Sequence, residues 1–127
     1  MKSEKASVLL VDDTVATSFV IQCMLETIGY DVECAFTGTE AVEKVVADRY
    51  LAVLMDVEMP DMDGIDATKA IRAKESVDLR PPLRIIGITG HTGQGIKLLC
   101  QRAGMDDFLP KPFVMSQLAE KLQGAVP

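Results

Sequence analysis

The sequence contains no long hydrophobic run. None of its apolar stretches approaches the roughly 20 residues that a helix needs to cross a bilayer. Residues 1–5 lead directly into a predicted strand, without the apolar core of a secretory signal. We therefore expect a soluble, cytoplasmic protein that is not inserted directly into a membrane.

Cysteine is scarce, and positive charge is outnumbered. Cys23, Cys34 and Cys100 are odd in number, widely spaced and set in apolar patterns, which favours reduced core residues over a metal site. The 13 Lys and Arg residues stand against 19 Asp and Glu residues, a formal net charge of −6. Because this balance offers no general attraction for a polyanion, we expect no direct contact with nucleic acid.

No internal repeat or low-complexity segment interrupts the 127 residues. We expect residues 1–127 to form a single domain, with about residues 1–6 as a flexible N-terminal extension. Short apolar runs alternate with segments of helical periodicity. They predict strands at residues 7–11, 31–35, 51–55, 83–89 and 105–109, and helices at residues 15–28, 37–47, 64–74, 96–104 and 114–122.

This alternation predicts an α/β fold with a doubly wound, five-stranded parallel sheet. The strand at 51–55 is apolar throughout, as in a strand covered on both faces, whereas the strand at 31–35 alternates like an edge strand. The usual order for five such strands is the flavodoxin-like order 2-1-3-4-5. That order places the first and third strands side by side.

Local patterns predict how several helices begin, end and pack. Thr14 is expected to cap the first helix and Gly29 to end it. The third helix is expected to stop near Lys74, because a polar stretch and Pro81-Pro82 follow. Apolar residues recur at helical spacing in the first helix (Val15, Phe19, Val20, Cys23, Met24 and Ile28) and in the last (Val114, Leu118 and Leu122).

Polar side chains follow four of the five predicted strands. Asp12 and Asp13 come after the first strand, Asp56 after the third, Thr89 after the fourth and Lys111 after the fifth. Since the carboxyl ends of parallel strands share one sheet edge, where ligands bind in such folds, we expect these side chains to gather there. Each close pair of carboxylates would repel by roughly 4 kcal/mol at an effective dielectric constant of about 20. A cation is therefore expected among them.

The cation that suits these ligands is Mg²⁺, with Mn²⁺ as the alternative. Mg²⁺ commonly binds one or two carboxylates together with phosphate oxygens, so the cluster predicts phosphate chemistry. Lys111 offers a fixed positive charge and Thr89 a hydroxyl, both suited to phosphoryl oxygens. Asp12 and Asp13 are adjacent and suited to metal, whereas Asp56 stands alone. We therefore predict that Asp56 is the nucleophile that forms an aspartyl phosphate.

Four motifs carry these residues: Val11-Asp-Asp13, Met55-Asp-Val-Glu-Met-Pro-Asp-Met-Asp-Gly64, Ile88-Thr89 and Leu109-Pro-Lys-Pro112. In this order they resemble a response-regulator receiver domain, the phosphoacceptor module of two-component signalling, over essentially the full chain. The resemblance implies phosphorylation by a histidine kinase or a histidine phosphotransfer protein, and signalling to a downstream effector protein or domain. The segment that begins at Met55 is similar to receivers of hybrid histidine kinases.

The same resemblance implies a role for each residue of the cluster. It implies catalysis of the protein's own phosphorylation and dephosphorylation, and no turnover of an external substrate. The bond between Lys111 and Pro112 would be cis. The implied metal ligands are Asp12, Asp13, Asp56 and the main-chain carbonyl of Glu58, and the implied catalytic residues are Asp56, Thr89 and Lys111.

A switch follows from the charge of a phosphoryl group, about −1.5 to −2. It could draw Thr89 and Lys111 inward and vacate space for Phe108, the position of the family's aromatic switch, which would change the surface over the fourth helix and fifth strand. The alternative for Phe108 is a plain core residue. Gly90 stands where the family usually has alanine, which predicts a looser loop after Thr89.

Other interpretations share parts of this pattern. The resemblance places Glu58 and His91 beside the route of attacking water, and we predict that they tune dephosphorylation. A metal-dependent phosphohydrolase with an aspartyl intermediate would usually carry its nucleophile after the first strand and would need a substrate-binding cap. A flavodoxin would need a loop rich in Ser, Thr and Gly after the first strand, where Asp12 and Asp13 stand. A docking module independent of phosphorylation is the third alternative.

Overall fold

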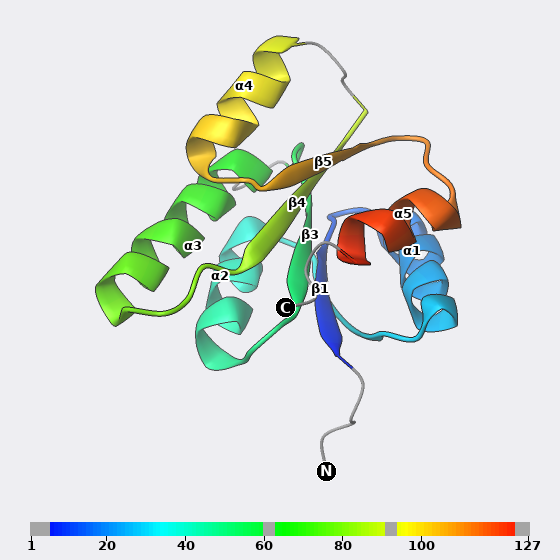
Figure 1. Cartoon of the computed structure of the whole chain (residues 1–127), viewed down its shortest axis with the longest axis horizontal. Helices are drawn as coiled ribbons and strands as arrows, with labels where there is room; N and C mark the ends of the chain where they lie inside the picture. Colours follow the sequence, from blue (N-terminus) through cyan, green and yellow to red (C-terminus); the bar gives the residue numbers. More distant parts are fainter. Residues whose placement is uncertain (1–5, 60–62, 91–93, 124–127) are drawn as a thin grey trace.

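The computed structural model describes residues 6–59, 63–90 and 94–123. They form a parallel sheet in the order β2-β1-β3-β4-β5 with helices on both faces (Figure 1). The predicted α/β class, parallel sheet and strand order are thereby confirmed. The strands are β1 (Ser7–Val11), β2 (Asp31–Ala35), β3 (Ala52–Asp56), β4 (Arg84–Thr89) and β5 (Asp107–Pro110), and the helices are α1 (Val15–Ile28), α2 (Gly38–Ala47), α3 (Gly64–Asp78), α4 (Gln94–Ala103) and α5 (Met115–Gln123).

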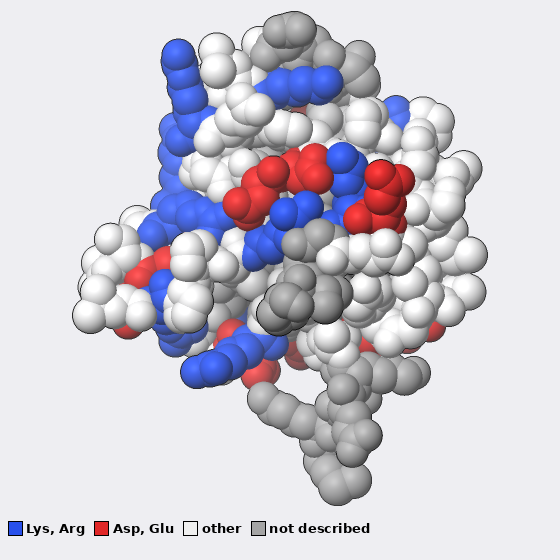
Figure 2. All heavy atoms as spheres, in the orientation of Figure 1, with Lys and Arg blue, Asp and Glu red and all other residues white. Residues whose placement is uncertain are grey.

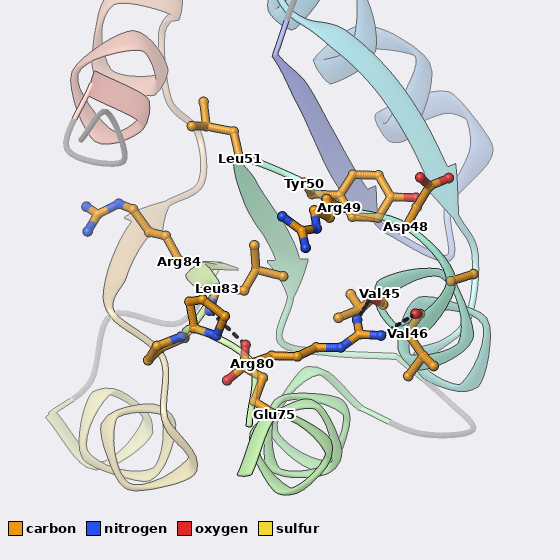
Figure 3. Close-up of a pocket in the computed structure, with 13 residues that line it drawn as sticks. Val45, Val46, Asp48, Arg49, Tyr50, Leu51, Glu75, Arg80, Leu83 and Arg84 are labelled. Atoms are coloured by element: carbon orange, nitrogen blue, oxygen red, sulfur yellow. Dashed lines mark hydrogen bonds between the residues drawn. The ribbon is translucent and has the colours of Figure 1, made fainter. Parts of the chain in front are cut away.

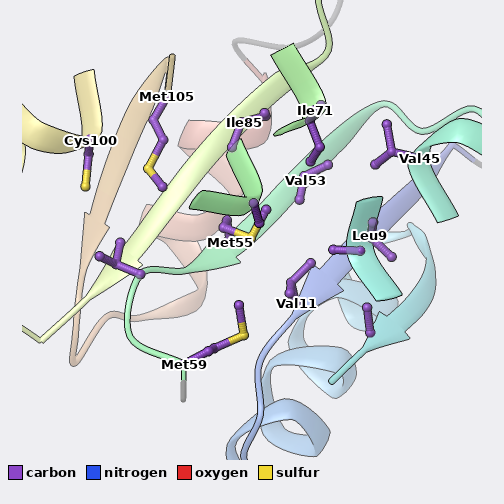
Figure 4. Close-up of a cluster of buried hydrophobic side chains, with 14 residues drawn as sticks. Leu9, Val11, Val45, Val53, Met55, Met59, Ile71, Ile85, Cys100 and Met105 are labelled. Atoms are coloured by element: carbon purple, nitrogen blue, oxygen red, sulfur yellow. The ribbon is translucent and has the colours of Figure 1, made fainter. Parts of the chain in front are cut away.

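Two hydrophobic layers cover the sheet, one on each face. Alternate residues of a strand point to opposite faces, so Leu9 and Val11 of β1 enter one layer, and Val8 and Leu10 enter the other. The first layer packs against α2, α3 and α4, and Figure 4 shows its side chains between the sheet and these helices. The second layer packs against α1 and α5. The strands β1 and β3 are therefore buried on both faces.

The apolar pattern of α1 did not identify its buried side. The buried residues of α1 are Ser18, Ile21 and Leu25, whereas Phe19 is 64% exposed and Val20 is 58% exposed. The helix carries apolar residues around most of its circumference, so helical spacing alone could not choose among the faces. Packing against the sheet and α5 chose the face of Ile21 and Leu25, which belong to the second layer.

The predicted Thr14 cap is wrong, and the predicted core position holds for only one of the three free cysteines. Thr14 occupies the N-cap position but makes no side-chain capping bond, because its hydroxyl points to Asp13 Oδ1 at 3.4 Å. Gly29 ends the helix in the left-handed region, as predicted. Of the three cysteines, only Cys100 is buried, while Cys34 is half-buried and Cys23 is exposed.

Helix α3 continues to Asp78, past its predicted end at Lys74. The reason is Glu75, which begins the polar stretch predicted to follow the helix but which is buried. Its carboxylate accepts hydrogen bonds from Arg72 Nη1 at 2.8 Å and from the Leu83 N–H at 2.7 Å. These partners extend the helix by satisfying a charged side chain inside the protein.

Smaller boundary differences occur after β4. Helix α4 begins at Gln94 instead of Ile96, and β5 begins at Asp107 instead of Met105. Val114 lies outside α5 and is exposed, whereas Leu118 and Leu122 are buried as predicted. His91 and most of the predicted extension at 1–6 fall outside the described residues. Within the described residues, no helix combines the length and apolar character needed to cross a membrane.

The end of β3 and the start of α3 approach each other so closely that position 64 has no room for a side chain. A Cβ on Gly64 would lie 2.2 Å from the main-chain oxygen of Asp56. We expect Gly64→Ala to lower the free energy of unfolding by about 3 kcal/mol, because the backbone must shift to relieve the overlap. Urea denaturation at constant pH measures the change.

Gly95→Ala is the matched control, since a Cβ there meets nothing within 4 Å. It should leave stability unchanged or raise it by up to about 1 kcal/mol, because alanine is the better helix former. Equal stability of Gly64→Ala and the wild-type protein would contradict the close approach described here.

Candidate functional site

The carboxyl ends of β1 and β3 bring three carboxylates together. The two strands are neighbours, with Val11 opposite Met55, so Asp12 and Asp13 follow β1 beside the place where Asp56 ends β3. Each of these aspartates offers one oxygen, and the three oxygens lie within 4.8 Å of one another. Asp12 and Asp56 are buried, whereas Asp13 is exposed. The cluster is thus partly buried at the edge of the sheet and open to solvent at Asp13.

Asp56 is held by groups from the loop that follows it and from the residue that follows β5. Its Oδ1 accepts a hydrogen bond from the Glu58 N–H at 3.0 Å, and Lys111 Nζ lies 4.0 Å from the same oxygen. The turn that follows β3 is fixed by the Val57 N–H, which donates to the Ile88 carbonyl, and by the Gly64 N–H, which donates to the Val57 carbonyl. The strand end therefore presents Asp56 in a defined position.

Thr89, the last residue of β4, and Lys111, the first residue after β5, reach the same edge. Thr89 is buried and lies opposite Pro110, and its carbonyl accepts a hydrogen bond from the Lys111 N–H at 2.8 Å. The peptide bond between Lys111 and Pro112 is cis, as the family resemblance implied. Together with Asp13 and Asp56, Lys111 lines a cavity of about 420 Å³.

The lining of this cavity includes two residues that are not among the predicted metal ligands or catalytic residues. Thr14 and Gly90 line it beside Asp13, Asp56 and Glu58. The sequence predicts Thr14 only as a helix cap, yet its N–H donates to Asp12 Oδ1 at 2.9 Å. Its place directly after Asp13 is the one signal in the sequence that could have suggested this.

Phe108 lies behind the site. Its half-buried ring packs against the first hydrophobic layer. Gly87 of β4 makes room for it, since a Cβ at position 87 would lie 3.4 Å from Phe108 Cδ1 and 2.6 Å from Met105 Sδ. This packing is compatible with a switch residue and with a plain core residue, so the predicted switch role stays a prediction. Glu58 is exposed at the cavity, and the predicted effect of Glu58 and His91 on dephosphorylation also stays a prediction.

The electrostatics of the cluster concentrate on Asp56. Burial raises its pKa to about 6, and the negative charges of Asp12 and Asp13 act in the same direction. The Glu58 N–H and the Lys111 ammonium oppose this rise without cancelling it. The fixed groups of the protein therefore leave negative charge uncompensated at this edge.

The donor set fits a divalent cation with a preference for oxygen. Three carboxylates within reach of one point, one of them open to solvent, leave space for water ligands and a phosphate oxygen. Sulfur and nitrogen ligands, which softer metals prefer, do not line the described part of the cavity. The arrangement can hold a cation and, next to it, a carboxylate able to attack phosphorus.

A larger cavity of about 630 Å³ lies elsewhere, between the ends of α2 and α3 and the starts of β3 and β4 (Figure 3). Arg80 crosses it and donates to the carbonyls of Val45 and Val46 at 3.0 and 2.8 Å. This cavity lies at the amino ends of the strands, whereas the carboxylates lie at their carboxyl ends. If the candidate site were chosen by cavity volume alone, the end of the sheet opposite the carboxylate cluster would be selected.

A family model described as the response regulator receiver domain matches residues 8–123. Among curated proteins, the chain is 40% identical over 120 residues to the sensor protein GacS of Pseudomonas syringae, covering 94% of this chain and 13% of GacS. It is 35% identical over 116 residues to hybrid signal transduction histidine kinase L of Dictyostelium discoideum, covering 89% of this chain and 7% of that kinase. The chain therefore spans only a small part of these relatives.

Two solved structures extend the comparison. The receiver domain of a sensor histidine kinase from Pseudomonas aeruginosa, determined with a magnesium ion in its active-site cleft, is 38% identical with a TM-score of 0.86, covering 94% of this chain and 96% of that one. The receiver domain of the Saccharomyces cerevisiae response regulator Ssk1, crystallised with the histidine phosphotransfer protein Ypd1, is 27% identical with a TM-score of 0.88, covering 94% and 87%.

The raised pKa of Asp56 predicts how stability depends on pH in the absence of divalent cations. Folding disfavours the ionised form, so the penalty is absent below about pH 4, grows between pH 4 and 6, and is complete above pH 6. We expect Asp56→Asn to raise the free energy of unfolding at pH 7.5 by about 1–2 kcal/mol, a shift reduced for screening by water. Urea denaturation in the presence of a chelator, from about pH 3.5 to 7.5, measures this difference in the free energy of unfolding between Asp56→Asn and the wild-type protein.

Glu43→Gln is the control, because Glu43 is an exposed carboxylate on α2. Its stability should follow the wild-type curve within about 0.5 kcal/mol at every pH. A gap between Asp56→Asn and wild type that stays constant across the pH range would show that burial does not penalise the Asp56 charge.

Proposed function

The chain belongs to the response regulator receiver domain family, and we propose that Asp56 accepts a phosphoryl group from a phosphohistidine donor in a reaction that depends on Mg²⁺. The protein is a receiver domain of a two-component phosphorelay. The observation that carries the proposal is the cluster of Asp12, Asp13 and Asp56 within 4.8 Å, with Lys111 Nζ 4.0 Å from Asp56. The magnesium ion in the similar Pseudomonas aeruginosa receiver supports it.

The transfer is a displacement at phosphorus. A carboxylate oxygen of Asp56 forms the new P–O bond, and the P–N bond to the donor imidazole breaks with its electron pair leaving on nitrogen. Asp12, Asp13, Asp56 and the main-chain carbonyl of Glu58 would hold Mg²⁺. When bound, this ion would neutralise the acidic cluster and stabilise charge on the phosphoryl oxygens. Lys111 provides the positive charge on the other side of Asp56.

We assign the response to Thr89 and Phe108. The added phosphoryl charge attracts the Thr89 hydroxyl and the Lys111 ammonium, which are joined through the hydrogen bond between Lys111 N–H and the Thr89 carbonyl. Movement of Thr89 frees space toward Phe108, and the surface over α4 and β5 changes as the ring takes it. A downstream effector would bind one of these two surfaces more tightly than the other.

The donor is proposed to dock on α1. Val15, Phe19 and Val20 are 70%, 64% and 58% exposed, and α1 starts directly after the Asp13-Thr14 wall of the cavity. Exposed apolar side chains next to a reactive group indicate a surface for a partner protein. A histidine phosphotransfer protein bound to the similar Ssk1 receiver supports this class of partner.

We propose that residues 1–127 act as one receiver unit of a larger hybrid histidine kinase. The relatives reported above are much longer kinases in which a segment of this size is matched. The unit would catalyse its own phosphorylation and dephosphorylation. A phosphohydrolase acting on external substrates is the weaker alternative, because the described residues contain no cap over the 420 Å³ cavity.

Phosphorylation is tested with acetyl phosphate and Mg²⁺, read out by intact mass. The wild-type protein should gain one phosphoryl group, and Asp56→Asn should gain none, since an amide is not a nucleophile of comparable strength. Asp66→Asn removes an exposed carboxylate on α3 and should be phosphorylated like wild type. An adduct of equal yield on Asp56→Asn, or on wild type in the presence of chelator, would rule out the proposed reaction.

Docking on α1 is tested separately from the chemistry. In the double variant Val15→Ser and Phe19→Ser, phosphoryl transfer from a phosphorylated histidine phosphotransfer protein should slow by about tenfold or more, as expected when apolar interface anchors are removed. Phosphorylation by acetyl phosphate should stay within about twofold of wild type, because the reacting groups are intact. Loss of both activities would point to a damaged site instead of a docking surface.

Val77→Ser serves as the control for this experiment. Val77 is 78% exposed near the end of α3, away from the cavity. Its variant should accept the phosphoryl group from both donors at the wild-type rate.

A further inference from the structure

Arg72 of α3 joins three segments at the end of the sheet opposite the phosphoryl site. Its Nε and Nη2 donate to the Gly104 carbonyl at 3.0 and 2.8 Å, and Nη2 also donates to Asp106 Oδ2 at 2.9 Å. Its Nη1 donates to Glu75 Oε1 at 2.8 Å. One guanidinium thus connects α3 with the turn between α4 and β5.

The two carboxylates that accept from Arg72 are themselves bonded to main-chain N–H groups at or just before the start of β4. Glu75 Oε2 accepts from the Leu83 N–H at 2.7 Å, just before β4, and Asp106 Oδ2 accepts from the Ile85 N–H at 2.8 Å. The Asp106 N–H in turn donates to the Ile85 carbonyl. Charge-assisted bonds of this kind, several of them at one guanidinium, fix the relative position of the groups they connect.

The Gly104 contact locks the carboxyl end of α4. Gly104 ends the helix with a φ of 114°. A Cβ there would lie 2.8 Å from Arg72 Cγ, so the arginine stem packs directly on the glycine. Among the residues of α4 whose burial the structure describes, the buried ones are Cys100 and Ala103, and both lie in this same half of the helix.

The amino end of α4 is held differently. Gly95 and Lys97 are exposed, and Ile96 is only half-buried. Helix α4 starts at Gln94, a short distance along the chain from Thr89 and Gly90 at the phosphoryl site. One end of α4 is therefore anchored by Arg72, and the other begins a few residues after Thr89, the residue proposed to move.

We propose that Arg72 is the clamp about which α4 turns. With Gly104 held, a displacement of Thr89 tilts the amino half of α4 and leaves its carboxyl end and the start of β5 in place. Without the clamp, the helix shifts as a whole and the signal is no longer confined to one surface. This inference rests on the proposed function, because it takes the movement of Thr89 as its input.

Hydrogen exchange read by mass spectrometry tests the clamp on the full chain, with and without acetyl phosphate and Mg²⁺. In the wild-type protein, phosphorylation should change the exchange of amides at 94–99 and leave those at 100–106 unchanged. In the double variant Arg72→Met and Glu75→Gln, amides at 100–106 should exchange about tenfold faster before phosphorylation and should also respond to it. The glutamine keeps an acceptor for the Leu83 N–H, so the variant does not bury an unpaired charge.

Arg102→Met is the matched control, since it removes the same charge from the last turn of α4 at an exposed position. Its exchange at 100–106 should equal that of wild type. Equal acceleration in Arg102→Met, or unchanged exchange at 100–106 in the Arg72 variant, overturns the clamp. Arg72→Lys, which keeps the charge but not the fork, should give an intermediate acceleration, and wild-type exchange there also overturns it.

Intact mass of the same samples separates the two proposals. If wild type gains no phosphoryl group, the proposed function fails, while the comparison of unmodified proteins still decides whether Arg72 anchors α4. If wild type is phosphorylated but its change extends through 100–106, the clamp fails and the proposed function stands.

Discussion

Repulsion among three carboxylates is the constraint around which this protein is built. Asp12, Asp13 and Asp56 lie together because β1 and β3 are neighbours and parallel, which makes both strands end at the same edge. The fold holds them there by burying apolar residues on both faces of these strands. The cost is visible in the pKa of Asp56, which burial and the neighbouring acids raise to about 6 despite Lys111. Binding a cation would therefore lower the electrostatic repulsion within this site.

Asp107, whose pKa is lowered instead of raised, shows that the carboxylate cluster has too few cationic partners of its own to offset burial. Burial also tends to raise the pKa of Asp107, but the Lys121 ammonium, the Phe108 N–H and Arg84 outweigh it, so the pKa lies below its usual value. Its bonds to Lys121 and Arg84 are 2.9 and 3.2 Å long. Figure 2 shows the acidic and basic side chains intermixed in the region of β5. There the protein supplies its own counter-charges, whereas at Asp56 it leaves room for those of a ligand.

The two ends of the sheet therefore have different tasks. The carboxyl end carries uncompensated charge, an open cavity and the exposed apolar residues of α1. The amino end carries the satisfied network of Arg72, Glu75 and Asp106, together with Arg80 on the carbonyls of α2. A reactive edge can change its charge without unfolding the domain when the other edge is held by bonds that do not take part in the reaction.

The strand positions and the location of the candidate site could be predicted from the sequence alone. The strand positions follow from continuous apolar runs. The sheet edge that carries the site follows from the acid, hydroxyl or lysine at the end of a run. Both patterns lie within a few consecutive residues, so they can be recognised without knowledge of the tertiary structure. The buried side of α1, the extension of α3 through Glu75 and the connections of Arg72 could not be predicted in this way. The buried side of α1 and the connections of Arg72 depend on partners that are distant in the chain, such as Leu118 and Gly104. Glu75 depends on the Leu83 N–H, which the turn after α3 brings back to it. The sequence alone determined which chemistry the sheet edge can hold. Only the tertiary structure decided which surfaces remain exposed and which end of α4 is anchored. The physical reason is that packing against distant segments selects one face of a helix such as α1, which is apolar on several faces.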